Sequence, residues 1–211
     1  MLQYLLHIDR HIAELIGQFG PQAYSVLFLI VFAETGLIVT PFLPGDTLLF
    51  AAGLFCRPGQ AGHLSYPLMF GVFVLAALCG DNVNYWVGRR LGPRLFRRED
   101  SKLFKRSHLE KTHEFFDRFG KRTVILARFV PIVRTFAPFV AGMAGMRYRE
   151  FLLYSVVGAL VWVGIFLSAG YFLGQIPAVE KNFTLAMLAM AVLTFLPMLA
   201  EFLKHRRRNA A

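Results

Sequence analysis

The stretch FAETGLIVTPFLPGD, residues 32–46, carries two carboxylates in a region that is otherwise apolar. The acids are Glu34 and Asp46, and the run TPFLPG at 40–45 between them contains two prolines and a glycine. Proline has no backbone N–H and its ring clashes with the preceding turn, so a helix does not continue through such a run. The sequence therefore predicts that residues 22–56 form two helical pieces that meet at a break.

The composition is that of an integral membrane protein. Of the 211 residues, 56% are hydrophobic and 17% are charged, and the mean hydropathy is +0.51. Soluble domains are about 45–50% apolar and about 25% charged. The formal net charge of +10 is concentrated at 89–122 and 204–211, which flank apolar segments as basic cytoplasmic loops do. We therefore predict lipid contacts and no nucleic-acid partner.

We expect an all-α polytopic membrane protein in which residues 1–211 form a single membrane domain. Segments of about 20 apolar residues are long enough to cross the hydrocarbon, and we expect Gly92-Pro93 to open a turn after the first such span. The predicted segments are an amphipathic helix at 1–18, the broken segment at 22–56, a spanning helix at 67–88, a basic cytoplasmic linker at 89–122 with an amphipathic helix at 103–120, a broken segment at 123–146, spanning helices at 151–174 and 182–203, and a basic tail at 204–211.

The second broken segment, 123–146, contains Arg128, Arg134 and two prolines. We interpret it as a re-entrant hairpin, because a hairpin leaves every basic cluster on the cytoplasmic side. In that topology the C-terminus is cytoplasmic, whereas a full crossing at 123–146 would place the basic tail outside. No comparable excess of positive charge indicates on which side of the membrane the N-terminus lies.

An internal repeat is indicated by the order of these segments. Each half contains an amphipathic helix, a Pro/Gly-broken segment and a spanning helix, with 1–88 as the first repeat. The broken segments close similarly, with Ala-Ala-Gly at 51–53 and Val-Ala-Gly at 140–142. Because one crossing separates the copies, the repeat is expected to be inverted. Interrupted segments at matching positions of two halves point to a transport site near the midplane.

The two broken segments carry opposite charges. A charge at the bilayer centre costs at least about 2.5–3.5 kcal/mol, so such residues pair or face water, and they usually serve a function. The planar guanidinium fork suits phosphate, so Arg128 and Arg134 are candidate substrate-binding residues. A low-dielectric site disfavours the charged form of a carboxylate, so Glu34 or Asp46 could exchange a proton or act as a gate. The alternative is that these residues only hold the hairpins together.

Other patterns give weaker predictions. Asp81, Tyr85 and Arg89, with the neighbouring asparagines 82 and 84, could line a cytoplasmic mouth or cap a helix end. There is no nucleophile elbow, phosphate-binding loop or HExxH pattern, and the two cysteines lack metal-ligand spacing. We therefore predict no enzymatic activity, no catalytic residues, no metal and no cofactor.

The assembled motifs resemble the DedA family, bacterial relatives of the SNARE-associated or VTT-domain proteins. The resemblance rests on FAETG at 32–36, PFLPGD at 41–46, Gly80-Asp81, YWVGR at 85–89, RFVP at 128–131, Arg134, Pro138 and Ala141-Gly142. It implies two opposed re-entrant hairpins, a multi-pass protein of the bacterial inner membrane, and lipid movement across the bilayer. In bacteria this includes return of undecaprenyl phosphate, in some members driven by the proton motive force. One departure is Asp46, where the family commonly has glutamate.

Our leading hypothesis is therefore a flippase or scramblase for a lipid with an anionic phosphate headgroup, with membrane lipids and protons as partners. One alternative is a proton-coupled exporter of small cations or drugs, in which the acids would bind the substrate. Another is a non-transporting membrane scaffold for envelope assembly. The sequence predicts no particular oligomeric state.

Overall fold

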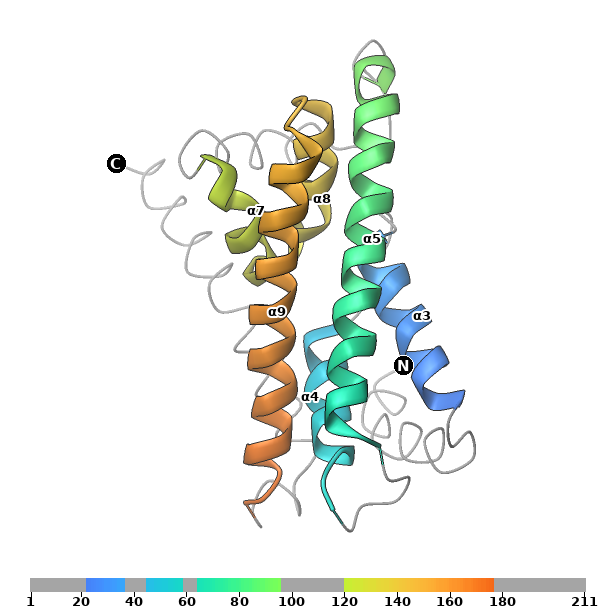
Figure 1. Ribbon diagram of the computed structural model, residues 1–211, viewed down its shortest axis with the longest axis vertical. Coiled ribbons are helices and arrows are strands. Elements are labelled where there is room, and N and C mark those ends of the chain that lie inside the picture. Colours follow the sequence, from blue (N-terminus) through green and yellow to red (C-terminus); the bar gives the residue numbers. More distant parts are fainter. Residues whose placement is uncertain (1–21, 37–44, 59–63, 96–119, 177–211) are drawn as a thin grey trace, which may run out of the picture. The chain divides into compact units, whose positions relative to one another are not determined.

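The computed structural model describes residues 22–36, 45–58, 64–95 and 120–176, and every regular element among them is helical (Figure 1). The predicted helix at 1–18, most of the linker, the last span at 182–203 and the basic tail lie outside these residues. The elements are α3 (Gln22–Gly36), α4 (Gly45–Phe55), α5 (Tyr66–Leu95), η1 (Gly120–Arg122), α7 (Thr123–Leu126), η2 (Ala127–Phe129), α8 (Pro131–Met143) and α9 (Tyr148–Leu173).

Two helices are long and apolar enough to cross a membrane. They are Tyr66–Leu91 within α5 and Tyr148–Leu173, which is α9, each of 26 residues. The all-helical, membrane-compatible class predicted from the sequence is thus confirmed. The predicted turn at Gly92-Pro93 is wrong, because α5 continues to Leu95. Proline this close to a helix end removes a single backbone hydrogen bond, a loss that the helix tolerates there.

The second broken segment is interrupted within the described residues, whereas the first is described only on either side of its predicted break. α3 ends at Gly36 and α4 begins at Gly45, with the predicted break between them outside the described residues. In the second segment Val130 is extended, with φ −121° and ψ 106°, and Pro131 opens α8. A residue before proline is driven toward the extended region, and proline suits the first helical position. That the two segments are re-entrant stays a prediction.

The described chain forms two compact units, and the continuous helices α3, α5 and α9 each contribute to both. The first unit contains residues 22–30, 45–58, 64–73 and 163–176, and the second contains 31–36, 74–95 and 120–162.

In the first unit α4 packs against α9 through glycines on both helices. A Cβ at Gly53 would overlap the carbonyl oxygen of Leu167, and a Cβ at Gly170 would overlap that of Phe50. Small residues allow two helix backbones to approach closely, as is common between helices in membranes.

The second unit contains the same kind of contact between α5 and α8. A Cβ at Gly88 would overlap the carbonyl oxygen of Phe139, and a Cβ at Gly142 would overlap that of Tyr85. α8 is therefore held against the backbone of α5 over at least one helical turn.

The C-terminus of α8 is closed by Gly145, which has φ 73°. The N–H of Met146 donates to the carbonyl of Ala141, and the N–H of Gly145 donates to that of Gly142. This is a Schellman motif, which satisfies carbonyls that the helix end leaves without partners. It lets the chain turn within a few residues from α8 into α9.

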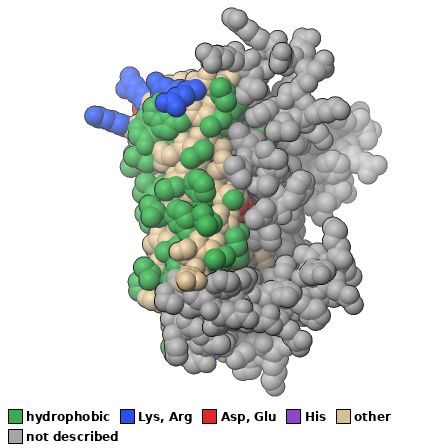
Figure 2. All heavy atoms as spheres, turned by 90° about the vertical axis from the view of Figure 1, so that its right-hand side faces the viewer, with side chains coloured by type: hydrophobic (Ala, Val, Ile, Leu, Met, Phe, Trp, Pro, Cys, Tyr) green, Lys and Arg blue, Asp and Glu red, His purple; other side chains and the backbone are tan. Residues whose placement is uncertain are grey.

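Large apolar side chains remain exposed along α5 and α9. Figure 2 shows a face on which hydrophobic side chains cover much of the described surface, while lysine and arginine side chains gather at one end. On α5 the exposed set includes Leu68, Leu75, Val83 and Leu91. An extended apolar surface of this kind marks a lipid or protein contact, and in helices of this length it suits lipid.

Candidate functional site

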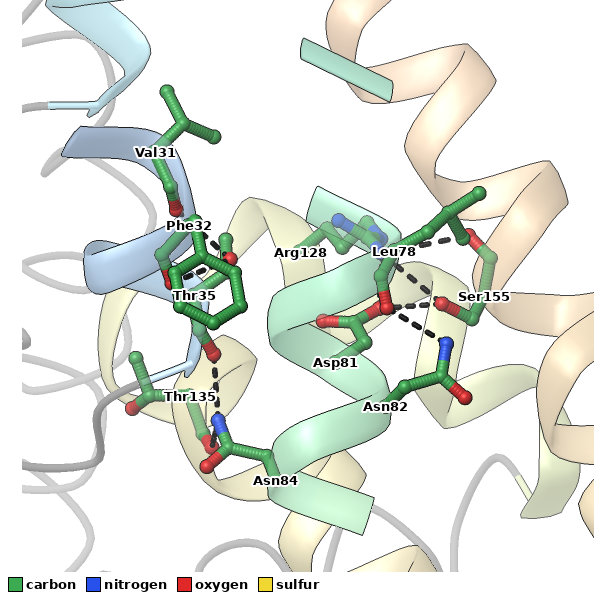
Figure 3. Close-up of polar contacts among 10 residues, drawn as sticks. All are labelled: Val31, Phe32, Thr35, Leu78, Asp81, Asn82, Asn84, Arg128, Thr135 and Ser155. Carbon is green, nitrogen blue, oxygen red and sulfur yellow. Dashed lines mark hydrogen bonds and ion pairs between the residues drawn. The ribbon is translucent and has the colours of Figure 1, made fainter. Parts of the chain in front are cut away.

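The second unit brings together charged and polar side chains from four separate parts of the sequence. α3 supplies Glu34 and Thr35, α5 supplies Asp81 and Asn84, and the segment from η2 into α8 supplies the two arginines; Ser155 and Trp162 come from α9. Figure 3 shows part of this group, with Asp81, Arg128 and Ser155 pointing toward one another.

Glu34 and Arg134 form an ion pair between α3 and α8. The Glu34 side chain is fully buried and that of Arg134 is 8% exposed. Because a charge removed from water is strongly destabilising unless it is compensated, the pair accounts for how two such residues coexist inside an apolar unit.

Arg128 makes a second ion pair, with Asp81 on α5. Ser155 Oγ donates to the same carboxylate oxygen, Asp81 Oδ2. Arg128 Nη2 also reaches Ser155 Oγ at 3.3 Å and the Ser155 carbonyl oxygen at 3.4 Å (Figure 3). Gly158 makes room for this arrangement, since a Cβ there would lie 2.9 Å from Arg128 Nε. Arg128 is thus held by two helices at once.

The indole ring of Trp162 lies against both arginines. The Arg128 guanidinium carbon is 6.0 Å from the ring centroid and that of Arg134 is 5.7 Å from it. Trp162 is only 1% exposed. Cation–π attraction is larger in such desolvated places than at a surface, so one aromatic face stabilises both guanidinium groups.

Small residues let the end of α3 approach α5 beside these pairs. A Cβ at Gly80 would overlap the Thr35 hydroxyl, and a Cβ at Gly36 would lie 3.2 Å from the Gly80 Cα. The Thr35 hydroxyl donates to the Val31 carbonyl at 2.8 Å, so it is satisfied within its own helix.

An aromatic cluster lies next to the ion pairs. Tyr85 stacks on Phe151 with ring centroids 4.4 Å apart, and the Tyr85 hydroxyl donates to the Met146 carbonyl at 2.5 Å. Arg89 donates to the Tyr85 hydroxyl at 2.8 Å, and the exposed ring of Trp86 lies under its guanidinium group. Aromatic and basic residues together are typical of the membrane–water interface.

The sequence-predicted site residues are distributed as follows. Glu34 and Arg134 are brought together, whereas Arg128 pairs with Asp81. Asp46 is buried in the first turn of α4, where a carboxylate is favoured by the helix dipole, and it belongs to the first unit. The transport roles assigned to these residues stay predictions.

The residues considered for a cytoplasmic mouth have different surroundings. Asp81 lies in the interior of α5 and is 5% exposed, and Tyr85 is fully buried, while Arg89 is exposed. Among these three, only Arg89 is open to the surroundings, and Asp81 belongs to the buried group of ion pairs.

Sequence reasoning missed Trp162 and Ser155. Both lie in the 24-residue uncharged segment that identified α9, and neither belongs to a motif. A signal was present: Ser155 is one of two serines in that segment and Trp162 is one of two tryptophans in the chain. Polar and amphipathic residues within a spanning helix usually face protein rather than lipid.

The arrangement is that of a helical membrane protein with compensated charges inside apolar segments. A family model described as the VTT domain matches residues 43–172. The chain belongs to the DedA family of VTT-domain membrane proteins, as its motifs indicated.

The chain is similar to several curated bacterial proteins. It is 50% identical to Protein DedA of Escherichia coli K12 over 210 residues, which cover 100% of this chain and 95% of that protein. It is 44% identical to an uncharacterized membrane protein of Mycobacterium tuberculosis, covering 92% and 86%. Inner membrane protein YqjA of Escherichia coli K12 is 36% identical, covering 75% and 70%. No solved structure matches the chain.

Proposed function

We propose that this protein moves a lipid with an anionic phosphate headgroup, undecaprenyl phosphate or a phospholipid, across the bacterial inner membrane. The observation that carries the proposal is that Arg128 and Arg134 are both buried, each paired with a carboxylate, and both against Trp162. A guanidinium group binds phosphate through two parallel hydrogen bonds. Each guanidinium has five N–H donors, more than one carboxylate can accept. Two guanidinium groups beside one ring therefore offer a phosphate several donors.

Anion exchange at Arg134 gives a route for binding. A phosphate that replaces the Glu34 carboxylate leaves Arg134 compensated, so no uncompensated guanidinium charge is buried at any stage. The displaced Glu34 then lies in an apolar unit without its partner, where the protonated form is favoured. Uptake of a proton by Glu34 would couple phosphate binding to the proton gradient.

Arg128 has a different part in this proposal. It is held by Asp81 and by two oxygens of Ser155. It therefore acts as the fixed side of the phosphate site, and Arg134 acts as the side that exchanges partners.

Equivalent helix contacts support the inverted repeat. Phe50 and Gly53 of α4 lie 89 positions before Phe139 and Gly142 of α8. The residues they meet, Leu167 and Gly170 on α9 and Tyr85 and Gly88 on α5, are related by 82 positions. We infer that each broken segment packs against the spanning helix of the other repeat.

The names of the relatives and the distribution of basic residues support a location and an orientation for the protein. The curated relatives are named as membrane or inner membrane proteins. With the linker and tail basic, we propose a multi-pass inner membrane protein with a cytoplasmic C-terminus.

The proposal is tested in proteoliposomes by following labelled undecaprenyl phosphate and labelled phospholipid, each in a separate assay. We expect Arg134→Ala to lower the translocation rate at least tenfold. Arg90→Ala is the matched control, because Arg90 is exposed and lies over Trp86, and its rate should stay within twofold of wild type. Equal rates for wild type and Arg134→Ala would contradict the assigned role.

Two further arms separate the alternatives. Transport of small cations without any lipid movement would favour a proton-coupled exporter. Envelope function retained after neutralising Glu34, Asp46, Arg128 and Arg134 together would favour a scaffold that moves nothing.

A further inference from the structure

Asn84 connects the backbones that carry the Glu34–Arg134 pair. Its side-chain amide donates to the carbonyl of Thr35 at 2.5 Å and to the carbonyl of Thr135 at 3.5 Å (Figure 3). Asn84 is 1% exposed, and the two bonds reach from α5 to α3 and to α8. The two acceptors directly follow Glu34 and Arg134 in the sequence.

The position of the Thr35 carbonyl makes this contact significant. α3 ends at Gly36, so Thr35 belongs to the last turn, and no described residue of α3 donates to its carbonyl. In an apolar surrounding each backbone carbonyl needs a donor. Asn84 supplies one, and it thereby fixes the end of α3 at the residue after Glu34.

The choice of an amide follows from its hydrogen-bonding capacity. Asparagine offers two N–H donors from one nitrogen and carries no charge, so it can bind two carbonyls without competing for Glu34 or Arg134. Both acceptors are backbone oxygens, which fixes the orientation of the amide. A serine offers one donor and a leucine offers none.

We propose that Asn84 is a positioning residue that sets the distance and angle between Glu34 and Arg134. It touches neither charge, and it acts through the backbone on both. The effect of Asn84 on the ion pair is independent of the proposed function. Only the expected effect of Asn84 on transport rests on it.

The direct test is a double-mutant cycle on the full chain, with unfolding followed in detergent micelles. The cycle uses Glu34→Gln and Arg134→Gln, and it is measured in the wild-type, Asn84→Ser and Asn84→Leu backgrounds. We expect the coupling between Glu34 and Arg134 to fall by at least half with Asn84→Leu, and by less with Asn84→Ser. Unchanged coupling in both backgrounds would overturn the proposal. If Asn84→Leu does not fold, the Asn84→Ser cycle decides alone.

Asn82→Leu is the matched control, because Asn82 is on the same helix and donates to the Leu78 carbonyl. It also accepts from the Tyr148 hydroxyl, and among the described residues its hydrogen bonds do not reach α3 or α8. It should leave the Glu34–Arg134 coupling at the wild-type value. An equal loss in Asn82→Leu would show a general loosening of α5 and would also overturn the proposal.

Transport gives a separate readout. With labelled undecaprenyl phosphate in proteoliposomes, we expect Asn84→Leu to raise the half-saturating lipid concentration at least fivefold, and Asn84→Ser to recover part of it. If wild type moves no lipid, the proposed function fails while the coupling result stands. If lipid moves normally in Asn84→Leu despite lost coupling, the positioning of the pair is irrelevant to transport, and that part of the inference fails.

Discussion

Glu34 is ion-paired with Arg134, a residue 100 positions away in the sequence, and both side chains are buried. The acid comes from the first broken segment and the base from the second. The pair therefore connects the first broken segment to the second through one of the two charges that each segment carries.

The first prediction concerns the stability of this pair. Neutralising one partner leaves the other charge buried and uncompensated, so Glu34→Gln and Arg134→Gln should each lower the free energy of unfolding by about 3–5 kcal/mol. The double variant should recover most of that loss, because no charge is then left over. The measurement is chemical unfolding in mixed micelles. Losses that simply add in the double variant would contradict the pairing.

The second prediction concerns Arg128. Asp81→Asn leaves its guanidinium without a carboxylate and should cost about 3–5 kcal/mol of unfolding free energy. Ser155→Ala removes a hydrogen bond to charged groups and should cost about 1.5–3 kcal/mol.

The same unfolding assay provides the control for Arg128. Lys121 and Glu150 pair at 2.7 Å on the surface, with side chains 55% and 32% exposed. Glu150→Gln should change stability by at most about 1 kcal/mol, since exposed ion pairs contribute little. A loss for Asp81→Asn as small as that for Glu150→Gln would show that Arg128 does not depend on Asp81.

The sequence predicted the helical class, the two helices long and apolar enough to cross a membrane, and the interruption of the second broken segment. These features follow from local rules: apolar length and the backbone limits of proline. It also identified Glu34 and Arg134 as charges within apolar segments, and the structure shows them buried as an ion pair. It did not predict that Arg128 pairs with Asp81. Asp81 lies near the basic end of its apolar segment in the sequence, which suggested that it caps a helix end and not that it is buried. The sequence also failed to predict that α5 continues past Pro93. The Gly-Pro pair suggested a turn, but a helix tolerates the loss of a single hydrogen bond near its end.

The contacts of Trp162 and Asn84 could not have been predicted in the same way, although Asn84 was among the candidates for a cytoplasmic mouth. Their importance lies in contacts to η2, α3 and α8, which are distant in sequence. Only the packing of α5 and α9 in the second unit shows which face of each helix those residues occupy.

The third prediction concerns the glycines that join broken segments to spanning helices. Gly88→Ala and Gly170→Ala each place a Cβ on a neighbouring carbonyl oxygen, and each should cost about 1–3 kcal/mol of unfolding free energy. The matched control is Gly71→Ala in α5, where a Cβ would meet nothing within 4 Å. Because alanine is the better helix former, this control should be neutral or stabilising by up to about 1 kcal/mol. Similar effects at all three positions would contradict the close contacts.

The fourth prediction concerns Trp162, which lies against both arginines of the proposed phosphate site. Trp162→Phe keeps an aromatic face, whereas Trp162→Leu removes it. Because a buried cation–π contact is worth about 1–2 kcal/mol, we expect Trp162→Leu to lower lipid translocation at least fivefold and Trp162→Phe to lower it less. The measurement is the proteoliposome rate per folded protein.

Trp86 provides a matched control for that experiment. Its ring also lies under two guanidinium groups, those of Arg89 at 5.8 Å and Arg90 at 5.7 Å, but it is 41% exposed. Trp86→Leu should therefore leave the translocation rate within twofold of wild type. If Trp86→Leu and Trp162→Leu slow transport equally, the effect comes from losing an aromatic residue in the fold and not from the face shared by Arg128 and Arg134.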